Sequence, residues 1–129
     1  MIKISKYHKN QHKQIYNSTI EFIDFIKKNV SLKNKTILDI GCGAGANTIY
    51  LAKKYPSSNI IGVDYNKSLI KYASSQLKKK KIGNCKFFSS SIESLSLKII
   101  NEKKIDIVLS FHFLSFTDEW ITENLKKIT

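Results

Sequence analysis

Short apolar runs alternate with amphipathic stretches along most of this chain of 129 residues. Between residues 13 and 30, apolar side chains recur three or four positions apart, which predicts a helix with one buried face. Four short runs rich in β-branched residues follow, and each has the length of a buried strand: 36–40, 59–64, 85–89 and 106–111. The stretches between these runs return to helical spacing.

The alternation of strands and helices predicts an α/β fold. We expect helices over 46–55 and 66–83, a short helix over 97–103, and a last helix from Thr117 or Asp118. Strands joined through helices lie parallel, and a parallel sheet is covered on both faces. Residues 1–129 therefore form one domain, in which the polar residues 1–12 are expected to be a loosely held arm.

The end of the first predicted strand carries the clearest chemical signal. Residues 37–45 read Ile-Leu-Asp-Ile-Gly-Cys-Gly-Ala-Gly, with glycines where the backbone turns and can approach a ligand closely. Asp39 lies inside this strand, and a buried carboxylate is costly unless a cation or several donors meet it. The second strand also ends on an acid, Asp64, which can accept hydrogen bonds from both hydroxyls of a ribose. A nucleoside ligand is expected where these two strands end.

Two classes of nucleoside ligand fit the glycine pattern. Gly41, Gly43 and Ala46 also satisfy a dinucleotide pattern, which would make the protein an NAD(P)-dependent oxidoreductase. Such a ligand places a pyrophosphate over the turn, where Asp39 adds unfavourable negative charge. A nucleoside with an amino-acid tail brings an ammonium group instead, so charge complementarity favours the second class.

The segment 37–45 resembles the first motif of the class I S-adenosylmethionine-dependent methyltransferases. The resemblance continues through 62–65, 87–95 and 105–110, and covers the chain from about residue 34 to residue 118. It implies a Rossmann-like sheet of strand order 3-2-1-4, S-adenosyl-L-methionine as cofactor, and methyl transfer to a small-molecule acceptor. The cofactor-binding residues that it implies are Asp39, Gly41, Cys42, Gly43, Gly45, Asp64, Tyr65, Ser91, Ile92 and Ser110.

The resemblance also implies a role for individual side chains. Asp39 helps to hold the amino group of the cofactor, Asp64 binds the ribose, and Tyr65 lies against the adenine. Ser110, at the tip of the fourth strand, matches a position that often contacts the methionine end.

The third motif departs from the family pattern. Ser91 stands where the family often has an aspartate that reaches the adenine amino group. A serine hydroxyl can accept the same hydrogen bond, and the backbone of Ile92 can serve the adenine ring nitrogen.

The chemistry itself makes few demands on side chains. Methyl transfer from a sulfonium is an in-line displacement, so alignment matters most, and a general base is needed only for some acceptors. His112, just beyond the fourth strand, is a weak candidate for that base. His8 and His12 lie four residues apart in the polar arm without a third ligand, so no metal site is expected. No Asn-Pro-Pro-Tyr segment follows the fourth strand, which argues against methylation of amino groups in DNA bases.

The net charge of +12 is a weak guide to partners. All of the 22 basic residues are lysine, whereas specific nucleic-acid sites rely heavily on arginine. The only dense run, 78–81, falls at the end of a predicted helix, where cations suit the helix dipole. We therefore expect no specific nucleic-acid partner. The sequence shows no membrane span or signal peptide, and Cys42 and Cys85 lack metal-type spacing, so we expect a cytoplasmic protein with reduced thiols.

The number of strands is smaller than the resemblance implies. The family's sheet continues beyond the fourth strand, and those later strands shape the acceptor pocket. We therefore expect a truncated form that binds cofactor weakly alone, or a chain whose exposed fourth strand is covered by a second copy or a partner. A non-catalytic binding or assembly module remains a further alternative.

Overall fold

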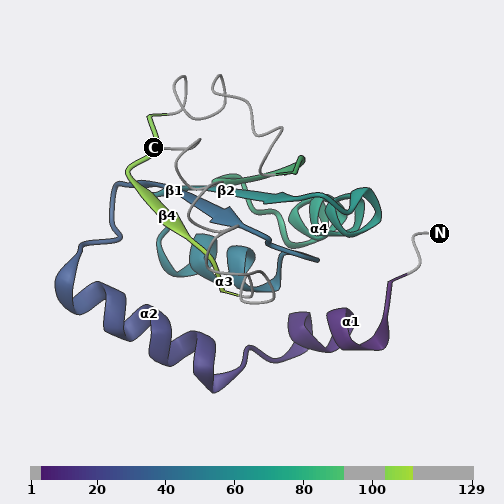
Figure 1. Ribbon diagram of the computed structural model, residues 1–129, viewed down its shortest axis with the longest axis horizontal. Helices are drawn as coiled ribbons and strands as arrows, with labels where there is room; N and C mark the ends of the chain where they lie inside the picture. The colour runs from purple at the N-terminus through teal and green to yellow at the C-terminus, as the bar shows by residue number, and fades with distance from the viewer. Residues whose placement is uncertain (1–3, 92–103, 112–129) are drawn as a thin grey trace, which may run out of the picture.

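A four-stranded parallel sheet forms the centre of the computed structural model, which describes residues 4–91 and 104–111 (Figure 1). Its strands are β1 (Thr36–Ile40), β2 (Asn59–Asp64), β3 (Cys85–Ser89) and β4 (Ile107–Leu109). They lie in the order β3-β2-β1-β4, and every neighbouring pair is parallel. The predicted fold class and strand order are confirmed. Within the described residues β4 borders one edge of the sheet.

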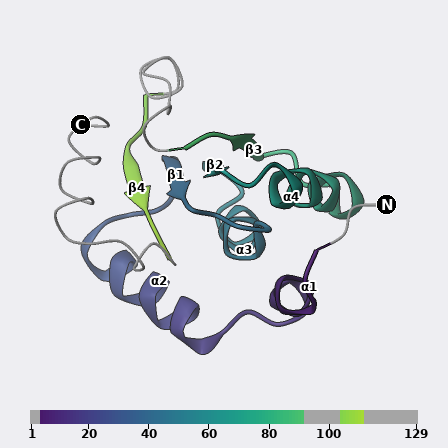
Figure 2. The same ribbon diagram turned by 45° about the vertical axis from the view of Figure 1, so that its right-hand side comes forward.

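The described residues also form four helices: α1 (Lys6–Lys13), α2 (Asn17–Asn29), α3 (Ala46–Lys54) and α4 (Lys67–Lys80). In the view of Figure 2, α1, α2 and α3 lie on the same side of the strands. Ile23 of α2, Leu51 of α3 and Ala73 of α4 are fully buried in one apolar cluster, which also includes Ile60 and Phe87 of the sheet. This cluster holds the helices against one face of the sheet.

The opposite face of the sheet is apolar as well. Alternate residues of β1 and β2 form a second buried cluster there, made of Leu38, Ile40, Ile61 and Val63. Strands that are apolar on both faces are typical of a parallel sheet covered on both sides. The helices expected over 97–103 and after residue 117 lie outside the described residues.

The amino-terminal region differs from the sequence prediction. Residues 6–13 form α1 instead of a loose arm, and the next helix begins at Asn17 instead of residue 13. Ser5 caps α1, because its Oγ accepts a hydrogen bond from the backbone N–H of His8 at 3.3 Å. None of the residues of α1 is fully buried, so this helix has no apolar stripe that periodicity could detect.

Helix α4 begins as predicted and ends earlier. The Asn66 side chain accepts hydrogen bonds from the backbone N–H of Ser68 at 3.0 Å and of Leu69 at 3.2 Å. The helix ends at Lys80, three residues before the predicted end at residue 83, and Lys81 takes the left-handed conformation, with φ of 56°.

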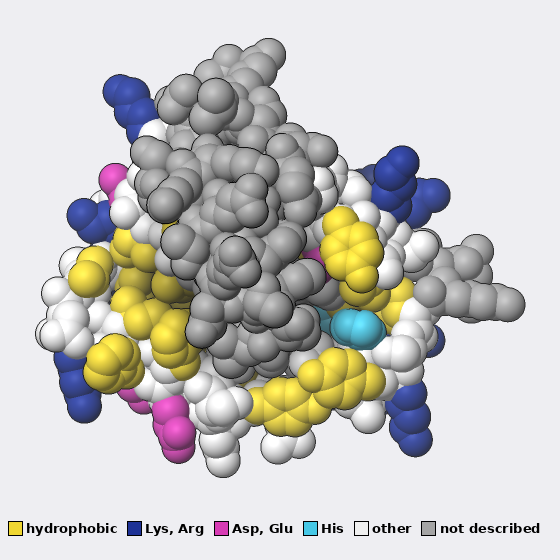
Figure 3. Space-filling model, in the orientation of Figure 1, with side chains coloured by type: hydrophobic (Ala, Val, Ile, Leu, Met, Phe, Trp, Pro, Cys, Tyr) yellow, Lys and Arg dark blue, Asp and Glu magenta, His cyan; other side chains and the backbone are white. Residues whose placement is uncertain are grey.

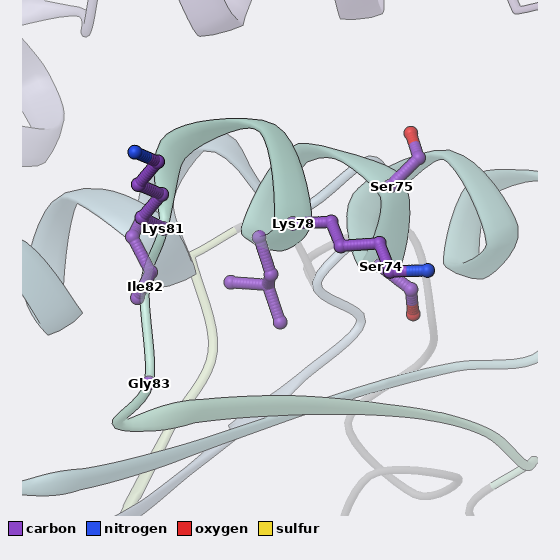
Figure 4. A pocket seen from close by; sticks show the side chains of 7 residues that line it. Ser74, Ser75, Lys78, Lys81, Ile82 and Gly83 are labelled. Carbon is purple, nitrogen blue, oxygen red and sulfur yellow. The ribbon is translucent and has the colours of Figure 1, made fainter.

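A shallow cleft of about 720 Å³ lies beside the end of α4 (Figure 4). Ser74, Lys78 and Lys81 line it, and Gly83 leads from it into β3. It therefore lies at the amino end of the strands, whereas ligands of parallel α/β sheets bind beyond the carboxyl ends. Lys78 lies in the last turn of α4 and Lys81 is its C-cap, where positive charges offset the helix dipole. Along the described chain, no helix is long and apolar enough to cross a bilayer.

Candidate functional site

The glycine turn joins the carboxyl ends of β1 and β2. The backbone N–H groups of Gly41 and Cys42 both donate to the Val63 carbonyl, at 2.9 and 3.0 Å. The N–H of Gly43 donates to Oδ2 of Asp64 at 2.9 Å. Gly41 and Gly43 have φ of 71° and 57°, in the left-handed region that glycine adopts without strain. The turn is therefore a rigid element fastened to the neighbouring strand.

Asp64 has a structural role that the sequence did not reveal. Besides the bond from Gly43, its Oδ1 accepts the backbone N–H of Asn66 at 2.9 Å. Each carboxylate oxygen can accept more than one hydrogen bond, so the half-buried carboxylate retains capacity for ligand hydroxyls. Tyr65 follows it with 77% of its surface exposed. Asp64 and Tyr65 thus lie together where the sequence predicted a ribose and adenine site.

A cleft of about 410 Å³ opens over the turn. One side is formed by Gly41, Cys42 and Gly43 together with residues 64–66 and Leu69. The other side is formed by three side chains of α1, which are Tyr7, His8 and Gln11. On the face shown in Figure 3, histidine side chains lie among hydrophobic ones, and the lysines project separately around the rim.

Asp39 lies below the turn with 1% of its surface exposed. Its Oδ2 accepts a hydrogen bond from Thr48 Oγ1 at 2.7 Å, and its Oδ1 has no hydrogen-bond partner among the described residues. Burial raises the pKa of Asp39 to about 7, nearby Asp64 raises it further, and the Thr48 bond opposes both. A cation or a donor close to Oδ1 would stabilise the ionised carboxylate.

His12 fastens α1 to the glycine turn. Its Nε2 donates to the Ala44 carbonyl at 2.6 Å, and its ring meets the Tyr72 ring edge-on with centroids 5.4 Å apart. Burial lowers the pKa of His12, and Lys80 and His8 lower it further, whereas the Ala44 bond raises it. The sequence interpretation placed this histidine in a loose arm. The four-residue spacing of His8 and His12, which puts both on one face of a helix, was the available signal.

Gly45 supports the site from below instead of lining the cleft. It caps α3 with φ of 84°, and a Cβ there would lie 2.4 Å from Cζ of Phe87 and 2.9 Å from Cβ of Ala73. Gly62 on β2 makes similar room, since a Cβ there would lie 2.6 Å from the Phe87 ring. These two glycines allow close packing of helix, turn and sheet.

Two more predicted residues lie close to the turn. Cys42 lines the cleft through the turn, and burial holds the pKa of its thiol well above the usual value. Cys42 and Cys85 are both free thiols, as expected. Ser91 follows β3 beside the tip of β2, because the N–H of Ser90 donates to the Asp64 carbonyl at 2.9 Å. Ile92 and His112 lie outside the described residues.

Ser110 follows directly after β4, beyond the pairing of Leu109 with Asp39. Its Oγ is buried and has no hydrogen-bond partner in the described part of the chain. The same holds for Oδ1 of Asp39 and Nδ1 of His12, and no other described side chain has such an atom. All three lie at the carboxyl end of the sheet. Buried polar groups without partners are rare in native proteins, so this concentration points to a ligand.

Several known proteins resemble this chain in sequence. The sequence model of a family described as a methyltransferase domain matches residues 31–127. The candidate methyltransferase 235L of Invertebrate iridescent virus 6 is 35% identical over 111 residues, which are 86% of this chain and 37% of that protein. The malonyl-[acyl-carrier protein] O-methyltransferase of Bacillus cereus is 33% identical over 92 residues, which are 71% of this chain and 30% of that enzyme. The chain thus spans less than half the length of both relatives.

Solved structures share its fold. A candidate S-adenosyl-L-methionine-dependent methyltransferase from Methanococcus maripaludis has a TM-score of 0.71 at 18% identity, over 99% of this chain and 62% of that one. PKMT2 from Rickettsia typhi, in complex with AdoHcy, has a TM-score of 0.65 at 24% identity, over 92% of this chain and 22% of that one. At these identities the likeness concerns the arrangement of strands and helices.

Proposed function

Because the chain belongs to the class I S-adenosylmethionine-dependent methyltransferases, we propose that it binds S-adenosyl-L-methionine in the cleft over its glycine turn. We further propose that it supplies the cofactor-binding part of an enzyme that methylates a small molecule. The complex of PKMT2 with AdoHcy, the demethylated form of this cofactor, supports the choice of ligand.

Asp39 is the observation that carries this proposal. Its buried carboxylate has one oxygen without a partner in the described chain, and burial raises its pKa to about 7. S-adenosylmethionine brings an ammonium group on its amino-acid tail and a positive sulfonium. Either charge would favour the ionised form of Asp39, directly or through a bridging water.

A dinucleotide is less compatible with the same geometry. Asp39 and Asp64 are close enough for the charge of Asp64 to raise the pKa of Asp39, so the turn lies between two acids. A pyrophosphate above it would add further negative charge. The charge of the site therefore disfavours the oxidoreductase hypothesis.

The remaining contacts fit a nucleoside. Asp64 offers acceptor capacity to ribose hydroxyls, and the exposed ring of Tyr65 is available to stack on adenine. When bound, the cofactor supplies an activated methyl group on sulfur. The protein's contribution is to hold that group in line with the acceptor and to exclude water.

Calorimetric titration of the 129-residue chain with S-adenosylmethionine, S-adenosylhomocysteine and NADH tests the proposal. We expect the first two to bind and NADH not to bind. Asp64→Asn should weaken binding about ten-fold, because an amide donates where the carboxylate accepts. The exposed Glu21→Gln is the matched acid-to-amide control and should leave affinity unchanged.

The other outcomes of this titration are equally informative. Preferential binding of NADH would contradict the proposal, and so would the absence of measurable binding for all three ligands. Methyl transfer from labelled cofactor to a panel of small acceptors then tests the second part. Tight cofactor binding without any transfer would restrict the chain to the role of a binding module.

A further inference from the structure

We propose that α1 is a wall of the cofactor site and that His12 is the positioning residue that holds it there. This inference rests on the proposed function, since the ligand that the wall would enclose is a nucleoside with an amino-acid tail. It concerns a helix that lies before the motifs of the first strand and contributes to none of them.

The cleft over the turn exists because α1 forms its second side. Tyr7, His8 and Gln11 face the glycine turn across a space of about 410 Å³. The His8 ring comes within 3.9 Å of the position that a Cβ on Gly43 would occupy, so helix and turn are close neighbours. A ligand lying on the turn would therefore also contact α1.

The polar groups of α1 are already ordered toward one another. Gln11 Nε2 donates to the Tyr7 hydroxyl at 3.0 Å, which leaves the phenolic proton free to donate elsewhere. Ser5 Oγ lies 2.7 Å from Nδ1 of His8 and fixes that ring. The wall thus offers hydroxyl, amide and imidazole groups, which suit the hydroxyls and carboxylate of such a ligand, without an acidic residue that would repel the carboxylate.

Helix α1 depends on its contacts with the rest of the chain. It has eight residues and no fully buried side chain, and isolated helices of this length are unstable in water. The hydrogen bond from His12 to the Ala44 carbonyl spans 32 positions in sequence and joins the helix directly to the turn. The edge-on contact with Tyr72 adds support from α4. Release of His12 would therefore free the wall of the cleft.

Burial at the anchor favours the neutral ring of His12. His8 on the same helix and Lys80 on α4 both oppose a positive charge there, Tyr72 offers only its ring edge, and the Ala44 carbonyl accepts from either form. Because burial lowers the pKa of His12, the folded chain favours the neutral form, and this contribution is lost as the pH falls through that lowered pKa. Acidification should loosen α1.

The experiment compares His12→Leu, His12→Gln and the exposed neighbour Lys13→Gln in the 129-residue chain. Hydrogen exchange of the α1 amides measures how firmly His12 holds the helix. The dissociation rate of S-adenosylhomocysteine measures how well the helix encloses the ligand. His12→Leu should speed both about five- to ten-fold, because it removes the donor. His12→Gln retains an N–H donor, so it should preserve both rates. Lys13→Gln should change neither.

A separate variant tests the wall without touching the anchor. Tyr7→Ala should speed dissociation while the exchange of the α1 amides stays as in the wild type. If His12→Leu speeds hydrogen exchange but leaves the dissociation rate unchanged, α1 does not enclose the ligand. If hydrogen exchange is unchanged, His12 does not hold α1 in place. Failure of the proposed function is a different observation, namely that the wild-type chain does not bind S-adenosylhomocysteine at all.

Discussion

The two ends of the sheet treat their buried polar groups differently. At the amino end, the Asn84 amide donates to three backbone carbonyls at 2.9 to 3.2 Å. Ser58 is 1% exposed, and its hydroxyl donates to the Leu32 carbonyl and accepts a backbone N–H. The polar groups of Asn84 and Ser58 therefore find hydrogen-bond partners within the chain itself.

At the carboxyl end, some buried polar atoms have no hydrogen-bond partner among the described residues. Asp39 Oδ1, Ser110 Oγ and His12 Nδ1 have no partner within the described residues. Both ends belong to the same sheet, so the difference between them does not come from a general failure of packing. The difference agrees with the proposal that one end of the sheet serves stability and the other holds a ligand.

Gly45→Ala should have the largest effect, because the carboxyl end is tightly packed although its hydrogen bonds are incomplete. The new Cβ would lie 2.4 Å from Phe87 and would occupy a backbone with φ of 84°. Overpacking and left-handed strain together should lower the free energy of unfolding by about 3 kcal/mol. Urea denaturation measures this. Gly83→Ala is the control, since a Cβ there meets nothing within 4 Å, and an equal loss in both variants would contradict the packing role.

Asn84→Ala should come next and should affect stability alone. Removal of the amide takes one donor from each of three carbonyls at the amino end, which should lower the free energy of unfolding by about 2 kcal/mol. Affinity for S-adenosylhomocysteine, measured where the variant is fully folded, should stay unchanged. Asn29→Ala removes an exposed hydrogen bond from a side-chain amide to the Phe25 carbonyl and serves as the control. A loss of affinity in Asn84→Ala would show that the two ends are coupled.

Asp39→Asn, in contrast to Asn84→Ala, should weaken cofactor binding, and it should also change how stability depends on pH. Between about pH 4 and 7, the folded chain retains a proton on Asp39 that the unfolded chain has released, because burial raises the pKa to about 7. Ionisation of Asp39 therefore lowers stability as the pH rises through this range. The amide cannot ionise, so this decline should disappear, while affinity for S-adenosylmethionine should fall about ten-fold.

Thermal unfolding across this pH range and calorimetric titration measure the two effects of Asp39→Asn. Glu21→Gln changes an exposed acid in the same way and should alter neither. If the variant kept full affinity for the cofactor, Asp39 would not be the partner of its positive charge.

The parts of the fold that sequence could predict are those with local causes. The short apolar strands and the start of α4 depend on neighbouring positions, and the structure confirms them. The helix was predicted to extend to residue 83, whereas it ends at Lys80 and Lys81 takes the left-handed conformation. Where a helix ends within a turn depends on tertiary packing, which local propensity does not contain.

The cofactor cleft was only half predictable for the same reason. The acids and glycines of the turn form a recognisable motif at the ends of two strands. The wall contributed by α1 depends on His12 and Ala44, which are 32 positions apart in sequence. A polar helix held by long-range contacts has no periodic pattern of apolar residues, so the sequence alone predicted a loose arm.

Tyr65→Ala should have the smallest effect and should be confined to the ligand. The side chain is 77% exposed, so its loss should leave the free energy of unfolding unchanged. Stacking of an aromatic ring on a base contributes about 1 kcal/mol, so affinity for S-adenosylhomocysteine should fall about five-fold. Tyr65→Phe keeps the ring and should keep the affinity. Tyr16→Ala removes another exposed ring that does not line the cleft, and should change nothing. If Tyr65→Ala lowered the free energy of unfolding instead, Tyr65 would contribute to stability, as residues at the amino end do. The proposed difference between the two ends would then not hold at this residue.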